Sequence, residues 1–315
     1  MRASAVFKAL LSPKFSEGSR LSANGTVEIS LPEDSATALR IVCNFAHLRM
    51  AEVPDSVSLV LLCDITRLVD KYDLATLLKH PASAWIEFLL PSASTAACEA
   101  LFVIAFLLRN DKALKTIGER ILLKSTAAVT GSGSKDVAVE SYDFATIFGM
   151  LNWPFLVHHP LTLILLARID SIRTKSLMSI GSEIEGILDS ERSVRATLGS
   201  NCLPGCIYAE KRLQFVTDEL ASHSLWPVLS LFNRPLEGTL YALKHFDFER
   251  MDRLDGGNAM PKCRQEHCAY NSSDSFETIA KWLKEEAEDI EKSIASVCYK
   301  CFRDGNASRE VCDHE

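Results

Sequence analysis

Apolar residues recur at helical spacing along most of the chain. Residues 5–11 show this spacing, and so does one face of the stretch that follows residue 64, which carries Ile65, Leu68, Val69 and Tyr72. Asp70, Lys71 and Asp73 fall largely on the opposite side of that stretch. We therefore predict a helix that ends near Tyr72, and we interpret the three charges as its solvated end rather than as a reactive site.

One segment near the N-terminus has a different period. Residues 26–31 alternate between apolar and polar positions after the turn signal Asn24-Gly25, which predicts a half-buried strand. Pro32, Glu33 and Asp34 then predict the start of a helix, because Pro suits the first turn and acids interact favourably with the positive end of the helix dipole. The pattern indicates a strand within an otherwise helical N-terminal region.

The rest of the chain has the pattern of helices joined by polar connections. Residues 96–108 are apolar almost all round, which predicts a buried helix. Their apolar run is shorter than the about 20 residues that a membrane span needs, so we expect no membrane contact. Residues 126–136 are small and polar, as in a linker. Further helices are predicted from Pro160, at about 207–222 and 236–247, and from Asp274 to about Cys298.

The composition is that of a folded protein with no overall attraction for polyanions. The 315 residues are 47% hydrophobic and 24% charged. The 34 Lys and Arg against 41 Asp and Glu give a net charge of −7, and no basic stripe offsets it, so we expect no nucleic-acid partner. Lys8 interrupts the first apolar segment, which does not resemble a secretory signal. We expect an intracellular protein, in the cytoplasm or the nucleus.

Cysteines near the C-terminus form a candidate metal site, since the 10 cysteines of an intracellular chain are expected to be thiols or metal ligands. Cys298 and Cys301 have the spacing with which two thiolates reach one zinc ion, and Cys263 with Cys268 is the candidate second pair. Alternative ligands are His267, Cys312 and His314. A competing interpretation is that Cys298 and Cys301 prolong an apolar helical stripe, because buried cysteine packs as a small hydrophobe. A structural zinc is the one candidate cofactor.

The chain lacks the sequence motifs of several common enzyme classes. It has no Gly-x-Ser-x-Gly elbow, no His-Glu-x-x-His helix and no phosphate-binding Walker loop. Residues 131–135 contain glycines and a lysine without a strand-to-helix context, so they are interpreted as linker. His158 and His159 precede Pro160, where paired histidines more often cap a helix or face solvent. We therefore expect that the protein is not an enzyme.

The order of the N-terminal elements resembles the BTB/POZ domain, especially the divergent BTB proteins common in filamentous fungi. The resemblance covers roughly residues 1–90 and is carried by "VFKALLSPKFSEG" (6–18), "VEISLPED" (27–34), "LRIVCNFAHL" (39–48) and "LVDKYDL" (68–74). The strand, helix and second strand with which the family usually begins have no counterpart before Val6. These elements contribute much of the family's dimer face, so we do not expect homodimerisation through that face.

The resemblance implies a protein–protein interaction module. In BTB domains that recruit cullin-type ubiquitin ligases, a hydrophobic-x-Glu motif contacts the cullin, and Phe15-Ser16-Glu17 stands at the corresponding place. Partner binding is expected at Phe15 and Glu17 and beside Tyr72, although Phe15 is also a candidate for closing the domain core. The chain would be a substrate adaptor for a cullin-type ligase. The alternative is a scaffold or transcriptional regulator without a ligase.

Together these features predict an α+β, mostly helical protein, in which a partial BTB/POZ-like domain is followed by an all-α region. The predicted organisation is a BTB/POZ-like domain over 1–90, further helices over 94–125, a linker over 126–140, a helical region over 141–250 and a cysteine-rich helical tail over 263–315.

Overall fold

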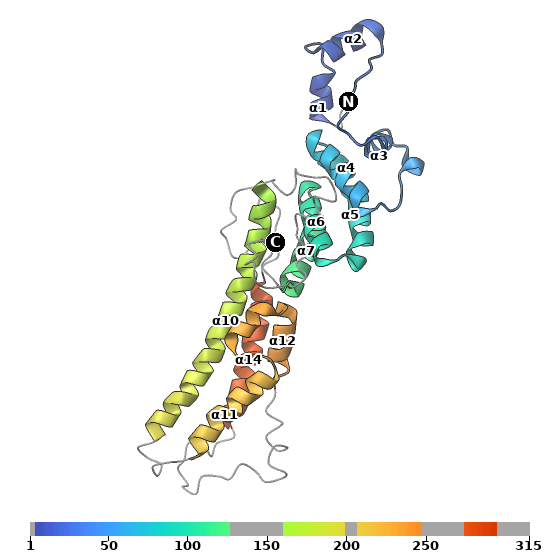
Figure 1. The fold of residues 1–315 in the computed structure, drawn as a ribbon. Helices are drawn as coiled ribbons and strands as arrows, with labels where there is room; N and C mark the ends of the chain where they lie inside the picture. Colours follow the sequence, from blue (N-terminus) through green and yellow to red (C-terminus); the bar gives the residue numbers. More distant parts are fainter. Residues whose placement is uncertain (1–3, 127–159, 199–206, 247–273, 295–315) are drawn as a thin grey trace. The chain divides into compact units, whose positions relative to one another are not determined.

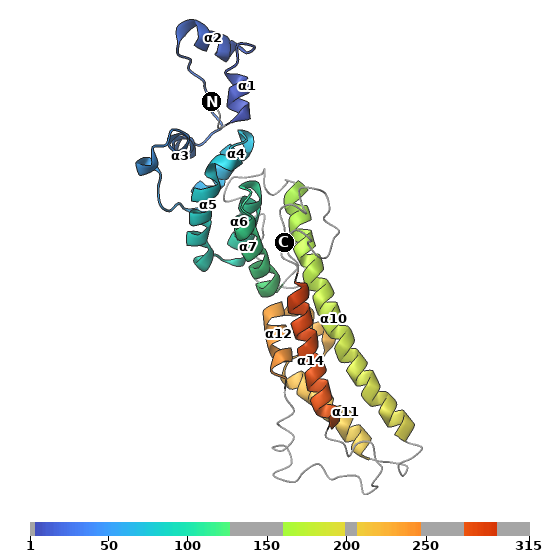
Figure 2. The same cartoon turned by 180° about the vertical axis from the view of Figure 1, so that it is seen from behind.

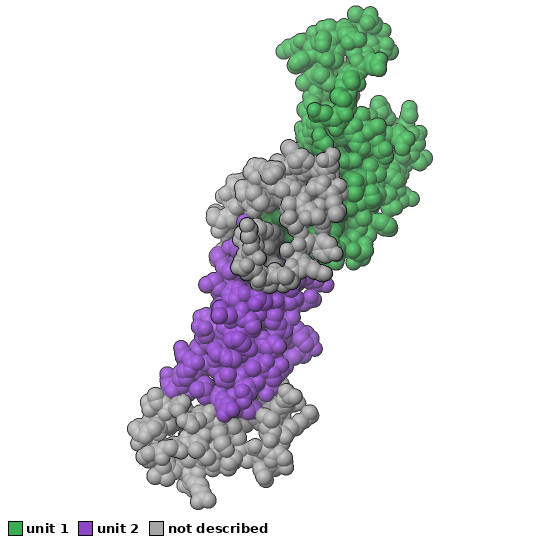
Figure 3. Space-filling model, in the orientation of Figure 1, with its two compact units in different colours: residues 1–121, 134–166, 296–315 green, residues 122–133, 167–295 purple. Residues whose placement is uncertain are grey.

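The computed structural model describes residues 4–126, 160–198, 207–246 and 274–294 (Figure 1). The chain divides into two compact units, which Figure 3 distinguishes by colour. Unit 1 comprises residues 1–121, 134–166 and 296–315, and unit 2 comprises residues 122–133 and 167–295. The domain limit predicted near residue 90 lies inside unit 1.

The described part of unit 1 is helical. Its elements are α1 (Ala5–Leu10), α2 (Ser16–Asn24), α3 (Ala36–Ala46), η1 (Met50–Glu52), α4 (Leu59–Lys71), α5 (Ala75–Leu89), η2 (Leu90–Ser92), α6 (Thr95–Leu107), most of α7 (Asp111–Lys124) and the start of α10 (Pro160–Leu198). In both views α1 and α2 extend away from the helices α3 to α7 (Figures 1 and 2). We call residues 4–25, which contain α1 and α2, the arm.

The core of unit 1 is built on α4 and α6. The face of α4 that the spacing predicts is buried, with Ile65, Leu68 and Val69 fully inside. Helix α6 is buried nearly all round, as its sequence predicts, because α4 and α5 pack against it. One acid, Glu99, is buried within this apolar helix.

Short local signals start and stop these helices. Serine side chains accept a hydrogen bond from a first-turn amide at four helix starts, namely Ser4, Ser35, Ser58 and Ser94. Helix α4 ends in a Schellman motif, in which the Leu74 amide donates to the Val69 carbonyl at 2.8 Å and Asp73 adopts a left-handed φ of 49°. Helices α3 and α6 end in the same way, at Leu48 and Arg109.

The strand predicted at residues 26–31 does not form, and the helix predicted from Pro32 begins later. Residues 26–31 have no regular structure, because a strand needs a neighbouring strand for its backbone hydrogen bonds and the described residues of unit 1 provide none. Ser35 caps α3 by accepting a hydrogen bond from the Ala38 amide at 3.4 Å. Asp34 therefore lies outside the helix. The mostly helical character is confirmed, whereas the α+β part of the prediction is not borne out over these residues.

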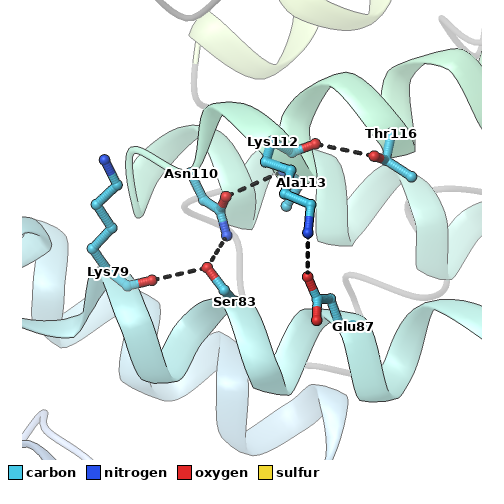
Figure 4. A network of polar contacts seen from close by, with 7 residues as sticks. All are labelled: Lys79, Ser83, Glu87, Asn110, Lys112, Ala113 and Thr116. Atoms are coloured by element: carbon cyan, nitrogen blue, oxygen red, sulfur yellow. Dashed lines mark hydrogen bonds and ion pairs between the residues drawn. The ribbon is translucent and has the colours of Figure 1, made fainter.

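A polar network fixes the corner between α6 and α7 against α5 (Figure 4). The buried Asn110 side chain accepts a hydrogen bond from the Ala113 amide at 3.1 Å and donates one to Ser83 Oγ at 2.8 Å. Beside it, Lys112 forms an ion pair with Glu87 at 3.1 Å. Asn110 thus caps α7 and joins it to α5, which satisfies a polar side chain that burial would otherwise make costly.

The described part of unit 2 is also helical. It contains most of α10 (Pro160–Leu198), together with α11 (Ile207–Ser222), η3 (Val228–Asn233), α12 (Leu236–Lys244) and α14 (Asp274–Ser293). The apolar stripe predicted for α14 is buried at Phe276, Ile279, Leu283, Ala287 and Ile290. On α10, the buried Arg173 guanidinium donates to the carbonyl oxygens of Phe232 and Arg234 at 3.0 and 3.1 Å. This side chain holds the turn between η3 and α12 onto α10.

Candidate functional site

Tyr72, at the end of α4, joins the arm to the helices α3 to α7. Its backbone carbonyl accepts a hydrogen bond from the Ser4 hydroxyl at 2.6 Å, and its ring stacks on the Phe7 ring with the centroids 4.5 Å apart. Its hydroxyl donates to Asp34 Oδ2 at 2.5 Å. Residues from three separate segments therefore meet at this one side chain. Tyr72 is 4% exposed, so it anchors the arm from the interior.

Asp34 also pairs with Lys71, whose Nζ lies 2.8 Å from Asp34 Oδ1. Burial alone would raise the pKa of Asp34, but hydrogen bonds from Lys71 and Tyr72 and the nearby positive charges outweigh it, so the pKa lies below its usual value. The bond to Asp34 raises the pKa of Lys71, and burial together with that carboxylate raises the pKa of Tyr72. Lys71 is exposed, as the spacing predicts, but it also neutralises an acid whose side chain is 1% exposed, a contact that the sequence pattern does not indicate.

The other two charges of this segment remain on the surface, as the spacing predicts. Asp70 and Asp73 are both exposed. Asp73 Oδ1 lies 3.7 Å from the Arg109 guanidinium, and each of these residues is the left-handed residue that ends its helix. Such an exposed pair contributes little to stability.

The two helices of the arm contain a single buried residue. Helix α1 has no buried residue, and Gly18 is the one buried residue of α2. A Cβ at Gly18 would lie 1.9 Å from the Ser12 carbonyl oxygen, so the two halves of the arm meet at a point where only glycine fits. Gly25 ends α2 with a φ of 72°, in agreement with the predicted turn. The arm thus has a defined backbone conformation, and most of its side chains are exposed or partly exposed.

Phe15 is exposed on the arm, and Glu17 is partly exposed beside it. Phe15 is the residue that precedes α2 and is 50% exposed, so it does not close the core as the alternative prediction had it. Glu17 follows in the first turn of α2, and Ser16 Oγ donates to its carboxylate at 2.8 Å. A hydrogen bond from its own backbone amide, then the bond from Ser16, hold the pKa of Glu17 below its usual value. An aromatic side chain and an ionised carboxylate are therefore presented together.

A second set of exposed apolar side chains, which the sequence pattern did not single out, lies on α3 to α5 and their connections. Its members are Leu48, Met50, Val60 and Phe88. Leu48 is 82% exposed. Its backbone is left-handed, which is an unfavourable conformation for leucine. Trp85, one turn before Phe88, donates from Nε1 to the Pro54 carbonyl at 2.9 Å, which brings the end of α5 to the connection that follows α3.

The candidate zinc ligands lie outside the described residues. These are Cys263, His267, Cys268, Cys298, Cys301, Cys312 and His314, and the pair His158 and His159 also lies outside. Within the described ranges no three His, Cys, Asp or Glu side chains gather as a metal site would require. Cys63 is buried, and burial raises the pKa of its thiol to about 12. Cys43 is exposed, and partial burial still raises its pKa, so neither thiol is activated as a nucleophile.

Comparisons with known proteins identify no relative of this chain. The chain matches no protein-family model, no curated protein and no solved structure. Among the helices of the described ranges, none combines the length and the apolar character that crossing a membrane requires.

Proposed function

We propose that the protein is a protein–protein interaction module that binds a partner through the arm, with Phe15 as the apolar anchor and Glu17 beside it. The observation that carries the proposal is the half-exposed aromatic ring of Phe15 on an arm whose two helices contain one buried residue, Gly18. Helices of six and nine residues are marginal in water by themselves, so their order depends on contacts such as those at Tyr72. A partner that covers Phe15 would add the apolar burial that the arm lacks.

We propose a cullin-type ubiquitin ligase scaffold as the partner, with the protein as its substrate adaptor. Support comes from the BTB/POZ-like residues of the N-terminal region and from the exposed Phe15 and the partly exposed Glu17 at the position of the hydrophobic-x-Glu motif. A desolvated aromatic anchor next to a charge can both hold and orient a partner. In this role other surfaces of the chain would hold the client protein.

The second candidate function is a scaffold or transcriptional regulator that has no ligase. The exposed apolar set of Leu48, Met50, Val60 and Phe88 favours it, because exposed apolar side chains outside the arm suit a protein that holds more than one partner. Neither candidate includes catalytic activity.

Affinity capture from extracts of cells that express the chain tests the proposal. The wild type and the variant Glu17→Ala are compared, with bound proteins identified by mass spectrometry. We expect a cullin with the wild type and its loss with the variant. Proteins that are captured through Phe15 without any cullin would support the scaffold function instead, and a capture that is the same for wild type and arm variants would contradict both.

A further inference from the structure

The charges of the arm are opposite in sign to those of the whole chain. Residues 4–25 contain three cations, Lys8, Lys14 and Arg20, and one acid, Glu17, whereas the full chain has a net charge of −7. All three cations are exposed. Over the described ranges, none of them forms an ion pair with a carboxylate. The arm therefore has an excess of positive charge, although Arg20 acts on Glu17 and, after the hydrogen bonds to that carboxyl, helps to lower its pKa.

From this charge balance we infer that the partner of the arm is a protein with an apolar pocket that receives Phe15 and with carboxylates that face Lys8 and Lys14. Positive groups at the rim of an interface are complementary to negative groups on the partner, which accelerates association and rejects partners with a basic surface. The apolar ring supplies the central contact, because charge pairs at an exposed rim contribute little each. The inference rests on the proposed function and specifies the chemistry of the partner.

The arm suits an acidic protein better than a membrane or a nucleic acid. An interfacial membrane helix needs a continuous apolar face, and α1 and α2 have six and nine residues with Val6 and Phe15 as their large exposed apolar side chains. Nucleic-acid binding draws on many phosphate contacts, and three cations on a chain of net charge −7 supply few. A protein surface can combine one apolar pocket with a few carboxylates.

Two measurements on the full chain test the inference. The probe is a purified protein. It is the most abundant of the proteins that the wild type captures and that the variant Phe15→Ala does not capture. In the first measurement, a carbodiimide joins lysine amines directly to carboxylates in the complex, and mass spectrometry locates the links. We expect links from Lys8 or Lys14 to Asp or Glu of the probe. This measurement uses the wild type, so it does not depend on whether a variant folds.

In the second measurement, the affinity of the probe is compared for the triple variant Lys8→Glu, Lys14→Glu, Arg20→Glu and for the control Arg40→Glu, Lys79→Glu, Lys115→Glu. The control makes the same change in net charge at three exposed cations of α3, α5 and α7. We expect the arm variant to bind about tenfold more weakly at about 0.15 M NaCl, with the difference shrinking at higher salt, and the control to bind like the wild type. A variant with Gln at the same three arm positions should show a smaller loss.

The outcomes separate the inference from the proposed function. If Phe15→Ala abolishes binding while the arm charge variant binds like the control and no carbodiimide link forms, the acidic surface is wrong and the proposed function stands. If the wild type captures no protein through Phe15, both are wrong. Arm-dependent binding of phosphatidylserine vesicles or duplex DNA, tighter than binding of the protein probe, would also overturn the inference.

Discussion

The Tyr72 hydroxyl and the Asp34 carboxylate are hydrogen-bonded at 2.5 Å although 38 positions separate them in the sequence. The second oxygen of the carboxylate pairs with Lys71, so the end of α4 holds the residues that precede α3 by two polar contacts. Because the carboxylate is buried, loss of either contact leaves it only partly satisfied. On the other side of the same tyrosine, Ser4 and Phe7 attach the arm.

Replacing Tyr72 with phenylalanine should destabilise unit 1 by about 1–2 kcal/mol, because the ring still stacks on Phe7 while Asp34 loses a donor. Urea unfolding followed by the fluorescence of Trp85, with the three other tryptophans changed to phenylalanine, measures the effect within unit 1. The control is Tyr241→Phe, which removes the hydroxyl of an exposed tyrosine in unit 2. Equal stability of Tyr72→Phe and its parent would contradict the account of Asp34.

Glu99 should make the stability of unit 1 depend on pH near neutrality. Burial raises its pKa from 4.5 to about 7. A carboxyl whose pKa is raised in the folded state stabilises the fold when protonated, so the free energy of unfolding should fall as the pH rises from 4.5 to about 7 and then level off. Glu99→Gln removes the cost of the charge and should gain up to about 3 kcal/mol over the wild type at about pH 8, and little at about pH 4.5.

Urea titrations at both pH values check this prediction, with Glu28→Gln, a change at an exposed acid, as the control. A stability difference between Glu99→Gln and the wild type that is the same at the two pH values would show that the buried acid is not the titrating group.

Leu48→Gly should stabilise unit 1 by about 0.5–1 kcal/mol. Leu48 has a φ of 59°, where glycine avoids the cost that leucine incurs, and its exposed side chain contributes little packing. Leu48→Ala is the matched control, because alanine keeps the unfavourable left-handed backbone. Thermal unfolding of the two variants distinguishes them, and an Ala variant as stable as the Gly variant would mean that the left-handed backbone carries no cost there.

Gly18→Ala should disorder the arm without unfolding the helices α3 to α7. The added methyl group has no room beside the Ser12 carbonyl, whereas a Cβ at Gly238 meets nothing within 4 Å. Hydrogen exchange of the α2 amides should therefore accelerate in Gly18→Ala, and the free energy of unfolding reported by Trp85 should change by less than about 0.5 kcal/mol. In the control Gly238→Ala, α12 should become about 0.5–1 kcal/mol more stable. Unchanged exchange in α2 would contradict the close approach inside the arm.

The sequence correctly predicts most periodic elements, but it does not predict contacts between residues that are far apart in the chain. The spacing of Ile65, Leu68, Val69 and Tyr72 correctly predicts the buried face of α4, because helical period is a local property. The same spacing assigns Lys71 to solvent, and no local signal indicates that Asp34 would turn toward it. Residues 26–31 have the alternation of a strand, but a strand also requires a partner.

The candidate partner-binding site on the arm is predicted only in part, because exposure also depends on contacts over long separations in the sequence. The resemblance indicates Phe15 and Glu17 as contact residues, whereas the exposure of Phe15 depends on how α1 and α2 leave the core. Leu48 was missed because its exposure follows from the end of α3, where a leucine stands at a position that usually takes glycine.

The central claim is that the arm binds a partner protein through Phe15. Affinity capture with Phe15→Ala, set beside Phe88→Ala, tests it most directly, because both substitutions remove a well-exposed phenylalanine from unit 1. The account predicts that Phe15→Ala loses a set of proteins that Phe88→Ala retains. Identical sets of captured proteins for the wild type, Phe15→Ala and Phe88→Ala would contradict it.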